Sequence, residues 1–458
     1  MSHNLIVRKH RDSIPITIVR TKNIDEWLDK ISLSQQKWLS QNGFKAKKNS
    51  IGLLPLRSGG LDKVVFVIDD STDLWCWSEL AANLPKATYW FHGSLDESMA
   101  TDAALGWGLA SYEFTKYRKP SLNRPKLVWP KNSDRSAVSY TLEAIKLVRD
   151  LINTPAEDMG PSELTTFIRS LARRFKATTK VIKGDSLLKA NYPMIHMVGR
   201  ASDDTPRLID MRWGNSGPLV TLVGKGVCFD TGGLDLKSAA GMLRMKKDMG
   251  GAAHVLGLAL MIMSAKLPVK LRVLIGAVEN SVSGNSYRPL DVLNTRKGIT
   301  VENVNTDAEG RLVLGDCLTE ASREKPDLLL NYATLTGASR VAVGTELAAM
   351  YCNNDDLSED FEKHAKLTND PLWRLPLYGP YRRMLDSKVA DISSASEGGF
   401  GGGITAALFL QEFVEKGIPW AHFDIMAWNT FSRAGRPEGG EAQAMRAAFS
   451  LIAERYGN

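Results

Sequence analysis

Two segments of the chain place lysines, carboxylates and an arginine close together among glycines. The first runs over residues 223–237 and reads V-G-K-G-V-C-F-D-T-G-G-L-D-L-K. It leaves an apolar run typical of a buried strand and enters a glycine-rich turn, so Lys225 and Asp230 lie where a sheet delivers side chains to a site. The glycines allow the backbone to approach a ligand closely. A phosphate-binding loop is disfavoured because Gly226, and not Ser or Thr, follows Gly-Lys.

The second segment, residues 305–316, reads N-T-D-A-E-G-R-L-V-L-G-D. Asp307 and Glu309 are two positions apart, so in an extended or turn conformation both carboxylates point to one side, and Arg311 points the same way. Taken alone, acidic residues near a helix start act as an N-terminal cap that satisfies the helix dipole. Only the combination with the first segment distinguishes a cap from a site.

Together with further strings, these segments resemble the catalytic domain of the leucyl aminopeptidase family, from about residue 140 to 458. The matching strings are V-G-K-G-x-x-F-D-x-G-G at 223–233, Lys237, D-M-G-G-A-A at 248–253, N-T-D-A-E-G-R-L at 305–312, A-T-L-T-G-A at 333–338 and W-R-L-P-L at 373–377. The resemblance implies a metal-dependent aminopeptidase, which releases N-terminal residues from peptides with a water activated by two metal ions.

The resemblance also implies a ligand set for two divalent cations, Mn²⁺ or Zn²⁺. Asp230 and Glu309 would bridge the ions, Lys225 and Asp248 would complete one shell, and Asp307 would complete the other. The four carboxylates supply four negative charges, which two divalent cations balance. Without cations, four buried acids at one place would be strongly disfavoured by mutual repulsion and desolvation.

The basic residues of the motifs are expected to have different roles. Lys225 as a ligand needs a neutral amine, and therefore a pKa far below the ordinary ~10.4. Lys237 is expected to stay protonated and to stabilise the transition state. Arg311 is the second catalytic cation implied by the resemblance, with bound bicarbonate near it as general base.

A pocket for the first side chain of the substrate follows from the same resemblance. It would be lined by Met245, Thr334, Gly337, Met426 and Asn429. The family's usual Asp-Ile-Ala-Gly-x-Met reads D-I-M-A-W-N at 424–429, so a larger side chain replaces alanine and an amide replaces methionine. We therefore expect a narrower or more polar pocket than a leucine-selective one.

Hydrophobic periodicity predicts the elements that position these residues. From about residue 136 onward, apolar strands alternate with helical patterns, which predicts an α/β domain with a mixed sheet flanked by helices. The predicted strands are Leu219–Val223, Leu271–Ala277, Leu328–Tyr332 and Trp420–Ile425, and the predicted helices lie near 250–264, 312–324, 404–416 and 441–455. His254 is expected to be a packed helix residue and not a metal ligand.

Residues 1–135 are predicted to form a small, variable N-terminal α/β domain. Apolar runs at Ile16–Val19 and Val64–Ile68 indicate strands, and Leu95–Tyr117 has helical periodicity. The segment 117–135 carries prolines and basic residues typical of an extended connector. We therefore place the catalytic domain at 136–458.

Composition excludes several classes of protein. The chain of 458 residues is 43% hydrophobic and 24% charged, as in an ordinary globular protein of two or three domains. Its four cysteines are far apart, which argues against a disulfide framework or a zinc finger and favours a reducing compartment. No signal-type apolar segment and no run of 18 apolar residues occurs, so we expect a cytoplasmic protein without a membrane partner.

Charge leaves one alternative function open. Residues 1–135 hold 20 Lys and Arg against 14 Asp and Glu, so most of the net charge of +7 lies there. This excess permits nucleic-acid binding, but a solvated face is the favoured explanation because no basic run with interleaved aromatics accompanies it. An inactive scaffold is disfavoured, since every position expected to bind metal is filled. The expected partners are peptide substrates and, by resemblance, further copies of the chain in a hexamer.

Overall fold

The computed structural model describes residues 3–121 and 123–457, which form two compact units. One contains residues up to 143 together with 431–438, and the other contains 144–430 and the residues from 439 onward. The boundary predicted at residue 135 coincides with the first residue of α5 (Arg135–Asn153). A small α/β unit and a larger unit with a mixed sheet between helices confirm the predicted fold class.

The smaller unit is built on a six-stranded sheet. In sheet order its strands are β1 (Leu5–Ile6), β6 (Lys126–Val128), β5 (Thr88–His92), β2 (Ile14–Arg20), β4 (Leu61–Ile68) and β3 (Ile51–Pro55). Its helices are α1 (Ile24–Asp29), α2 (Leu33–Gln41), α3 (Leu74–Asn83) and α4 (Glu97–Ala110). Both strands predicted here are confirmed as β2 and β4. The proline-rich segment is more than a connector, because β6 within it pairs in parallel with β1 and β5.

The segment 431–438 is remote in sequence but packs within this smaller unit. The Arg436 guanidinium lies 4.0 Å from the centre of the Trp75 ring, a cation–π contact. Gly435 has φ +73° and abuts the Ser78 side chain, so a Cβ there would meet Ser78 Oγ at 2.5 Å. Periodicity could not predict this excursion, because it depends on a contact across more than 350 residues of chain.

The larger unit is built on an eight-stranded mixed sheet. In sheet order its strands are β15 (Leu372–Arg374), β14 (Ala348–Cys352), β17 (Trp420–Asp424), β13 (Leu328–Ala333), β9 (Leu219–Asp230), β10 (Lys270–Asn280), β8 (Arg207–Trp213) and β7 (Thr178–Lys183). Smaller sheets are formed by β11 (Val292–Asn294), β12 (Thr300–Glu302) and β16 (Ile392–Ser393), and by β18 (Trp428–Asn429) and β19 (Gly439–Gly440). β17, β13, β9 and β10 run parallel, so their carboxyl ends share one edge of the sheet.

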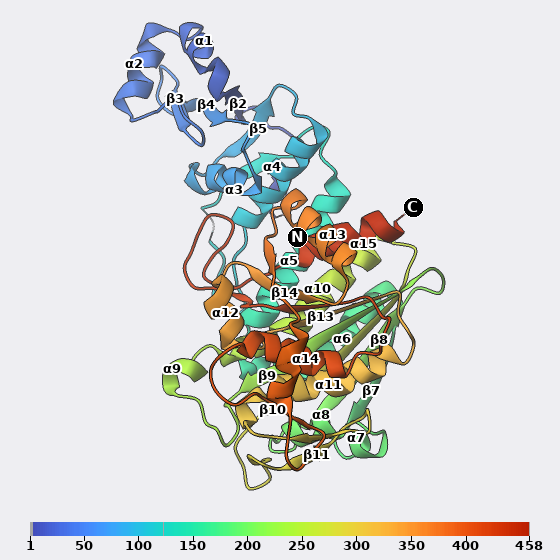
Figure 1. The fold of residues 1–458 in the computed structure, drawn as a ribbon. Helices are drawn as coiled ribbons and strands as arrows, with labels where there is room; N and C mark the ends of the chain where they lie inside the picture. The colour runs from blue at the N-terminus through green and yellow to red at the C-terminus, as the bar shows by residue number, and fades with distance from the viewer. Residues whose placement is uncertain (1–2, 122, 458) are drawn as a thin grey trace. The chain divides into compact units, whose positions relative to one another are not determined.

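Helices cover both faces of this sheet (Figure 1). α8 (Pro193–Gly199), α11 (Glu309–Ser322) and α14 (Gly402–Glu412) pack on one face, and α6 (Pro161–Phe175), α10 (Gly250–Ala265) and α15 (Met445–Tyr456) lie behind it. The remaining helices are α5, α7 (Ser186–Lys189), α9 (Ala239–Met242), α12 (Gly337–Val343) and α13 (Asp355–Leu367). The four strands and four helices predicted for this part of the chain are confirmed, with ends that differ by a few residues.

The largest such difference concerns β9. The predicted strand ended at Val223, but β9 continues to Asp230 and therefore contains Lys225 and Gly226. The glycines do not end the strand, because β10 pairs with it along its whole length. Gly224 also admits the backbone of α10, where a Cβ would meet Ala252 Cα at 2.7 Å. At Gly224, therefore, the group that comes close to the backbone is α10 and not a ligand.

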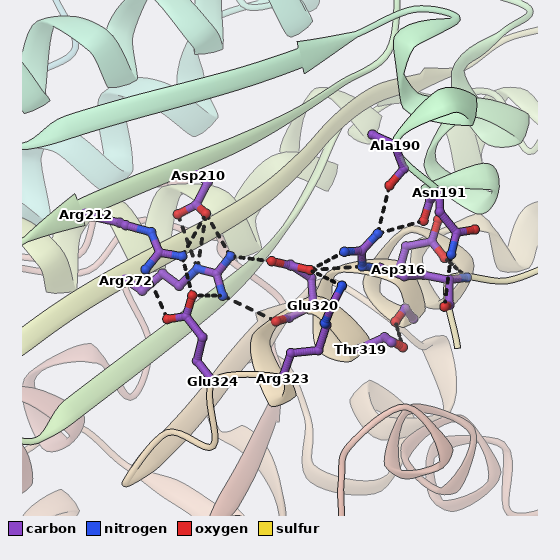
Figure 2. Close-up of polar contacts among 12 residues, drawn as sticks. Ala190, Asn191, Asp210, Arg212, Arg272, Asp316, Thr319, Glu320, Arg323 and Glu324 are labelled. Atoms are coloured by element: carbon purple, nitrogen blue, oxygen red, sulfur yellow. Dashed lines mark hydrogen bonds and ion pairs between the residues drawn. The ribbon is translucent and has the colours of Figure 1, made fainter. Parts of the chain in front are cut away.

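A network of arginines and acids anchors α11 to the sheet and to the loops beside it (Figure 2). Arg272 of β10 contacts Asp210 of β8 and Glu320 of α11, each at 2.8 Å from its Nη2. Arg296 pairs with Glu320 through Nε at 3.0 Å. Buried Asp316 accepts backbone hydrogen bonds from Met194 at 2.9 Å and from Arg296 at 2.9 Å. These contacts fix the carboxyl-terminal half of the helix whose first turn carries Glu309 and Arg311.

One helical stretch, Met245–Ala265, is long and apolar enough to cross a membrane, and 89% of its apolar window is buried inside the protein. It includes α10, which packs between the sheet and α15. The four cysteines are buried and unpaired, as expected for a chain without disulfides. Two of them, Cys228 and Cys317, fill space in the core.

Two buried histidines, His254 and His422, predict the response of stability to acid. His254 Nδ1 donates to Gly250 O at 2.6 Å and its Nε2 accepts from Gln443 N at 2.9 Å, so the ring is neutral. Burial lowers the pKa of each histidine to about 4. Because an unfolded histidine has a higher pKa, each one stabilises the fold above about pH 6.5, and this contribution is lost as pH falls towards 4.

We expect the free energy of unfolding to fall between pH 6.5 and 5 in urea titrations. By pH 4 each histidine should have lost about 3 kcal/mol of its contribution to the free energy of unfolding. This figure follows from its pKa shift, because each pKa unit corresponds to about 1.4 kcal/mol. His422→Gln should flatten this slope, and exposed His10→Gln should leave it unchanged. Equal slopes in all three proteins would contradict the assignment.

Candidate metal centre

Six charged side chains converge where the central strands end. Lys225 and Asp230 come from β9, and Lys237 comes from the loop that follows it. Asp248 lies in a 3₁₀ helix, Met245–Met249, directly before α10. Asp307 lies in a 3₁₀ turn at Thr306–Ala308, and Glu309 is the first residue of α11. All the metal ligands expected from the sequence therefore lie in one place, although Glu309 is helical and not extended.

Lys225 forms the centre of one half of the cluster. Its Nζ lies 2.6 Å from Asp248 Oδ2 and 2.8 Å from Glu309 Oε1. It also donates to Thr334 O at 3.3 Å, and Thr334 Oγ1 donates to Asp248 Oδ1 at 2.7 Å. The residue is 3% exposed. One ammonium group thus holds two carboxylates of separate elements together.

Gly310 makes room for this arrangement. A Cβ at Gly310 would lie 2.5 Å from Lys225 Cε and 2.7 Å from its Nζ. Any other residue would force the lysine away from Glu309. The glycine between Glu309 and Arg311 is therefore a steric requirement of the site.

Lys237 forms the centre of the other half. Its Nζ lies 2.8 Å from Asp230 Oδ2 and also bonds Asp307 Oδ1. The second oxygen of Asp230 accepts from Gly232 N and from Asn280 Nδ2, each at 2.9 Å. Asp230 is 2% exposed, whereas the side chain of Asp307 is 34% exposed. The cluster therefore opens to solvent on the side of Asp307.

The donor set fits divalent cations. Asp230, Asp307 and Glu309 each offer one ligand oxygen, and these oxygens lie within 4.8 Å of one another. Within the described part of the chain, the buried Asp248 Oδ2 and Glu309 Oε1 are contacted by Lys225 Nζ, at 2.6 and 2.8 Å, and by no other hydrogen-bond donor. Buried carboxylate oxygens with free lone pairs are the ligands that hard divalent cations prefer.

Mutual repulsion shows in the pKa values of the acids. Burial and the neighbouring Asp230 raise the pKa of Glu309 well above its ordinary value, and the same two causes raise the pKa of Asp307. Burial lowers the pKa of Lys225, but Asp248 and Glu309 outweigh it and hold that pKa above its ordinary value. The lowered pKa expected from the sequence thus requires positive charge beyond that of the protein's own groups.

Arg311 lies in the first turn of α11 and is 8% exposed. Its Nη1 donates to Ser394 O at 2.7 Å, which fixes the direction of the guanidinium. Its Nε is buried without a partner among the residues that the structure describes. Burial lowers the pKa of Arg311 to about 10, so it stays positive at neutral pH. An unpaired buried guanidinium nitrogen fits an anion such as bicarbonate.

The five predicted pocket residues lie on several elements. Thr334 contacts Asp248 directly, and Met245 begins the 3₁₀ helix that contains Asp248. Gly337 is exposed at the start of α12, and Met426 is 9% exposed. Asn429 is buried and donates to Glu441 Oε2 at 2.6 Å, so its amide is already engaged. The narrower, more polar pocket stays a prediction. Met426 supports the narrowing, whereas the Asn429 amide, which already donates to Glu441, gives weaker support for the polarity.

Sequence reasoning missed the groups that orient the ligands. Asn280, at the end of β10, donates to Asp230 Oδ1 at 2.9 Å and to Thr306 O at 3.0 Å. Thr306 Oγ1 donates to Gly232 O at 2.7 Å, which joins the two motif loops. The only sequence signal for Asn280 is its position at the end of a predicted parallel strand.

Comparison with known families agrees with this geometry. The family described as "M17 aminopeptidase, N-terminal domain" matches residues 14–130, and "Cytosol aminopeptidase family, catalytic domain" matches residues 146–449. The chain belongs to the cytosol aminopeptidase family. It is therefore a metal-dependent aminopeptidase, a hydrolase that removes N-terminal residues from peptides. The resemblance to the leucyl aminopeptidase family is confirmed.

Individual relatives extend over most of the chain. A probable cytosol aminopeptidase from Nitrobacter winogradskyi is 37% identical, covering 82% of this chain and 77% of the relative. The crystal structure of the cytosol aminopeptidase from Coxiella burnetii is 47% identical, with 99% of each chain covered and a TM-score of 0.94. The bottromycin maturation enzyme BotP in complex with Mn is 30% identical, with 97% and 99% covered and a TM-score of 0.86.

Removal of the Asn280 amide should weaken metal binding without unfolding the protein. We expect Asn280→Ala to lower the affinity for Mn²⁺ by about 10- to 100-fold, because orienting partners of ligands typically contribute that much. Competition with a fluorescent chelator measures the affinity, and exposed Asn294→Ala is the matched control. An affinity equal to that of the wild type would show that Asp230 needs no orienting partner.

Proposed function

We propose that the cluster binds two divalent cations and that they carry the peptidase reaction. Asp230, Asp248, Asp307, Glu309 and the amine of Lys225 would hold the ions. The observation that supports this is the convergence of four carboxylates around Lys225 and Lys237, in which Asp248 and Glu309 lie buried against one ammonium group. The oxygen-rich set favours Mn²⁺, the metal named for the bottromycin relative, and Zn²⁺ is the second candidate.

The chain's own cations then have distinct roles. When bound, two divalent ions supply an activated water and a Lewis acid for the scissile carbonyl. Lys237 donates a hydrogen bond to the oxygen on which negative charge develops. Burial lowers its pKa, but Asp230 and Asp307 outweigh it and keep the ammonium protonated. Asp307, the more exposed acid, lies on the side from which a peptide enters.

Arg311 would hold the anion that accepts a proton. Its Nη1 is fixed by Ser394 O, and its unpartnered Nε is available to a bicarbonate oxygen. A bicarbonate held there would supply a base for general acid–base catalysis beside the metal centre. Arg311 itself keeps its protons, because its pKa of about 10 lies well above neutral pH.

The substrate is proposed to be a peptide with a free N-terminus in a pocket formed by Met245, Thr334, Gly337 and Met426, with Asn429 behind them. The pocket residues rest on the family resemblance. We also propose a cytoplasmic location, which the names of the relatives support. Neither the family matches nor the relatives support the nucleic-acid-binding alternative.

A hexamer is proposed on the resemblance to the family. Apolar side chains that lie exposed in the larger unit support an assembly, with Leu243 77%, Val341 89% and Phe400 89% exposed. Light scattering should give six times the mass of one chain. A monomer at micromolar concentration would contradict the proposal.

Two substitutions should separate catalysis from metal binding. Lys237→Ala is expected to lower kcat by about 100- to 1000-fold, the usual cost of losing one transition-state donor, while the metal content stays at two per chain. Asp307→Ala should lose activity together with at least one metal ion. Metal analysis and turnover of alanine p-nitroanilide measure both effects. Exposed Lys270→Ala is the control, and full activity in both site variants would refute the mechanism.

A panel of aminoacyl-amides should show the shape of the pocket. We expect leucine to be turned over no better than alanine, methionine or polar residues, because Met426 occupies space that alanine leaves open in the family. Met426→Ala should raise kcat/KM for leucine relative to alanine by about tenfold, a typical value for added room of one to two methylenes. A strong leucine preference in the wild type would remove the basis for a narrowed pocket.

A further inference from the structure

Positive charge collects beside the predicted pocket, apart from the metal ligands. Lys247 directly precedes Asp248 in the 3₁₀ helix and is 2% exposed. Arg340 lies on α12, and its guanidinium is within electrostatic range of the Lys247 amine. Two basic groups on separate elements thus lie near one region, where burial first, and Arg340 after it, lower the pKa of Lys247.

Neither group is paired within the protein. The Nη1 of Arg340 is buried and has no hydrogen-bond partner among residues 3–121 and 123–457. In the same residues, the Lys247 side chain forms no hydrogen bond and no ion pair. The carboxylate of Asp424 lies within electrostatic range of Lys247, but its Oδ1 accepts from Leu335 N at 2.9 Å and its Oδ2 from Thr336 Oγ1 at 2.6 Å. Asp424 is therefore engaged in holding the loop before α12. Asp248, the stronger acidic neighbour of Lys247, is engaged by Lys225 and Thr334.

Unpaired buried donors of this kind are costly unless a ligand satisfies them. Leaving a buried polar group without a partner typically costs about 1–3 kcal/mol, and more for a charged one. The planar guanidinium of Arg340 matches a carboxylate and keeps its charge at every physiological pH. The amine of Lys247 can donate a hydrogen bond in either protonation state. The pair therefore suits a carboxylate.

The position of Lys247 and Arg340 indicates that the carboxylate they bind belongs to the substrate's first residue. Arg340 Nη2 lies 3.8 Å from the point that a Cβ on Gly337 would occupy, so the guanidinium borders the space above this exposed glycine. Lys247 is two residues from Met245 and adjacent to Asp248, whose oxygens contact Thr334 and Lys225. The pair thus lies beside three of the pocket residues and next to the metal centre.

We propose that Lys247 and Arg340 bind the side-chain carboxylate of an acidic N-terminal residue, so that the enzyme releases glutamate and aspartate from peptides. This inference rests on the aminopeptidase function and the pocket proposed above, and names a substrate class within it. The C-terminal carboxylate of a short peptide is the other source of the same chemistry. A neutral residue of the same shape lacks the charge that the pair recognises.

The test compares glutamate with glutamine, which differ by one charged group. For the manganese-loaded enzyme, kcat/KM for α-glutamyl coumarylamide should exceed that for the glutaminyl compound by about tenfold or more, the value of one charge-assisted bond. In Arg340→Gln this ratio should fall to about one, chiefly through loss of turnover of the glutamyl compound. Arg340→Lys should keep part of the preference, and exposed Arg288→Gln should keep all of it.

A binding measurement gives a readout that does not depend on turnover. L-Glutamate should raise the melting temperature of the wild type more than L-glutamine does, and this difference should vanish in Arg340→Gln. Comparison of leucyl-alanine with leucyl-alaninamide tests the peptide's own C-terminus. Arg340→Gln could change the ratio of kcat/KM between leucyl-alanine and leucyl-alaninamide and leave the glutamate-to-glutamine ratio as it is. That result would overturn the inference about the first residue.

The remaining outcomes are equally distinct. If the wild-type enzyme cleaves the leucyl compound but prefers glutamine to glutamate, the proposed peptidase function is supported and this inference is overturned. Loss of leucyl turnover in both Arg340 variants would assign the arginine a structural role and also overturn it. An enzyme that cleaves none of the amides with two metals bound would contradict the proposed function itself, and this inference with it.

Discussion

Four carboxylates in one buried place impose the constraint on which the rest of the larger unit depends. Burial and the charge of Asp230 raise the pKa values of Glu309 and Asp307 in spite of the protein's own cations, whereas for Asp248 the nearby lysines outweigh burial and lower the pKa. Lys225 and Lys237 each hold two of the acids, one on each side of the cluster. The arrangement is favourable only where positive charge is concentrated, which is the property that a metalloenzyme needs at its centre.

The fold meets this constraint through two elements that approach each other closely. β9 carries Lys225 and Asp230, and α11 brings Glu309 against them because Gly310 leaves room for the lysine. The far end of α11 is held by Arg272 and Arg296 through Glu320 (Figure 2). The acids at the first turn therefore cannot drift apart without breaking ion pairs at the last turns of the same helix.

The fold class could be predicted from the sequence, as could the convergence of the acidic and basic motif residues, because both depend on local strings and on periodicity. The start of the helix at Glu309 is predicted to within three residues, whereas the predicted strand ends at Val223, seven residues before the end of β9, and leaves Lys225 outside it. The error lies at glycines whose neighbours are far along the chain. Asn280 and Asp424 could not be assigned roles, since each acts through contacts with residues distant in sequence. The pKa of Lys225 likewise depends on three acids from different segments. For Lys247 and Arg340, a sequence shows the charges but not whether the protein pairs them.

The central position of β9 has a consequence for the order in which the protein is made. Every proposed metal ligand lies at or before Glu309, yet Lys225 and Asp248 are held by Thr334, and β13, which precedes Thr334, separates β9 from β17. A ribosome must therefore synthesise well past the last ligand before the centre can take its shape. The newborn chain therefore carries every proposed metal ligand before it holds the residue that fixes two of them.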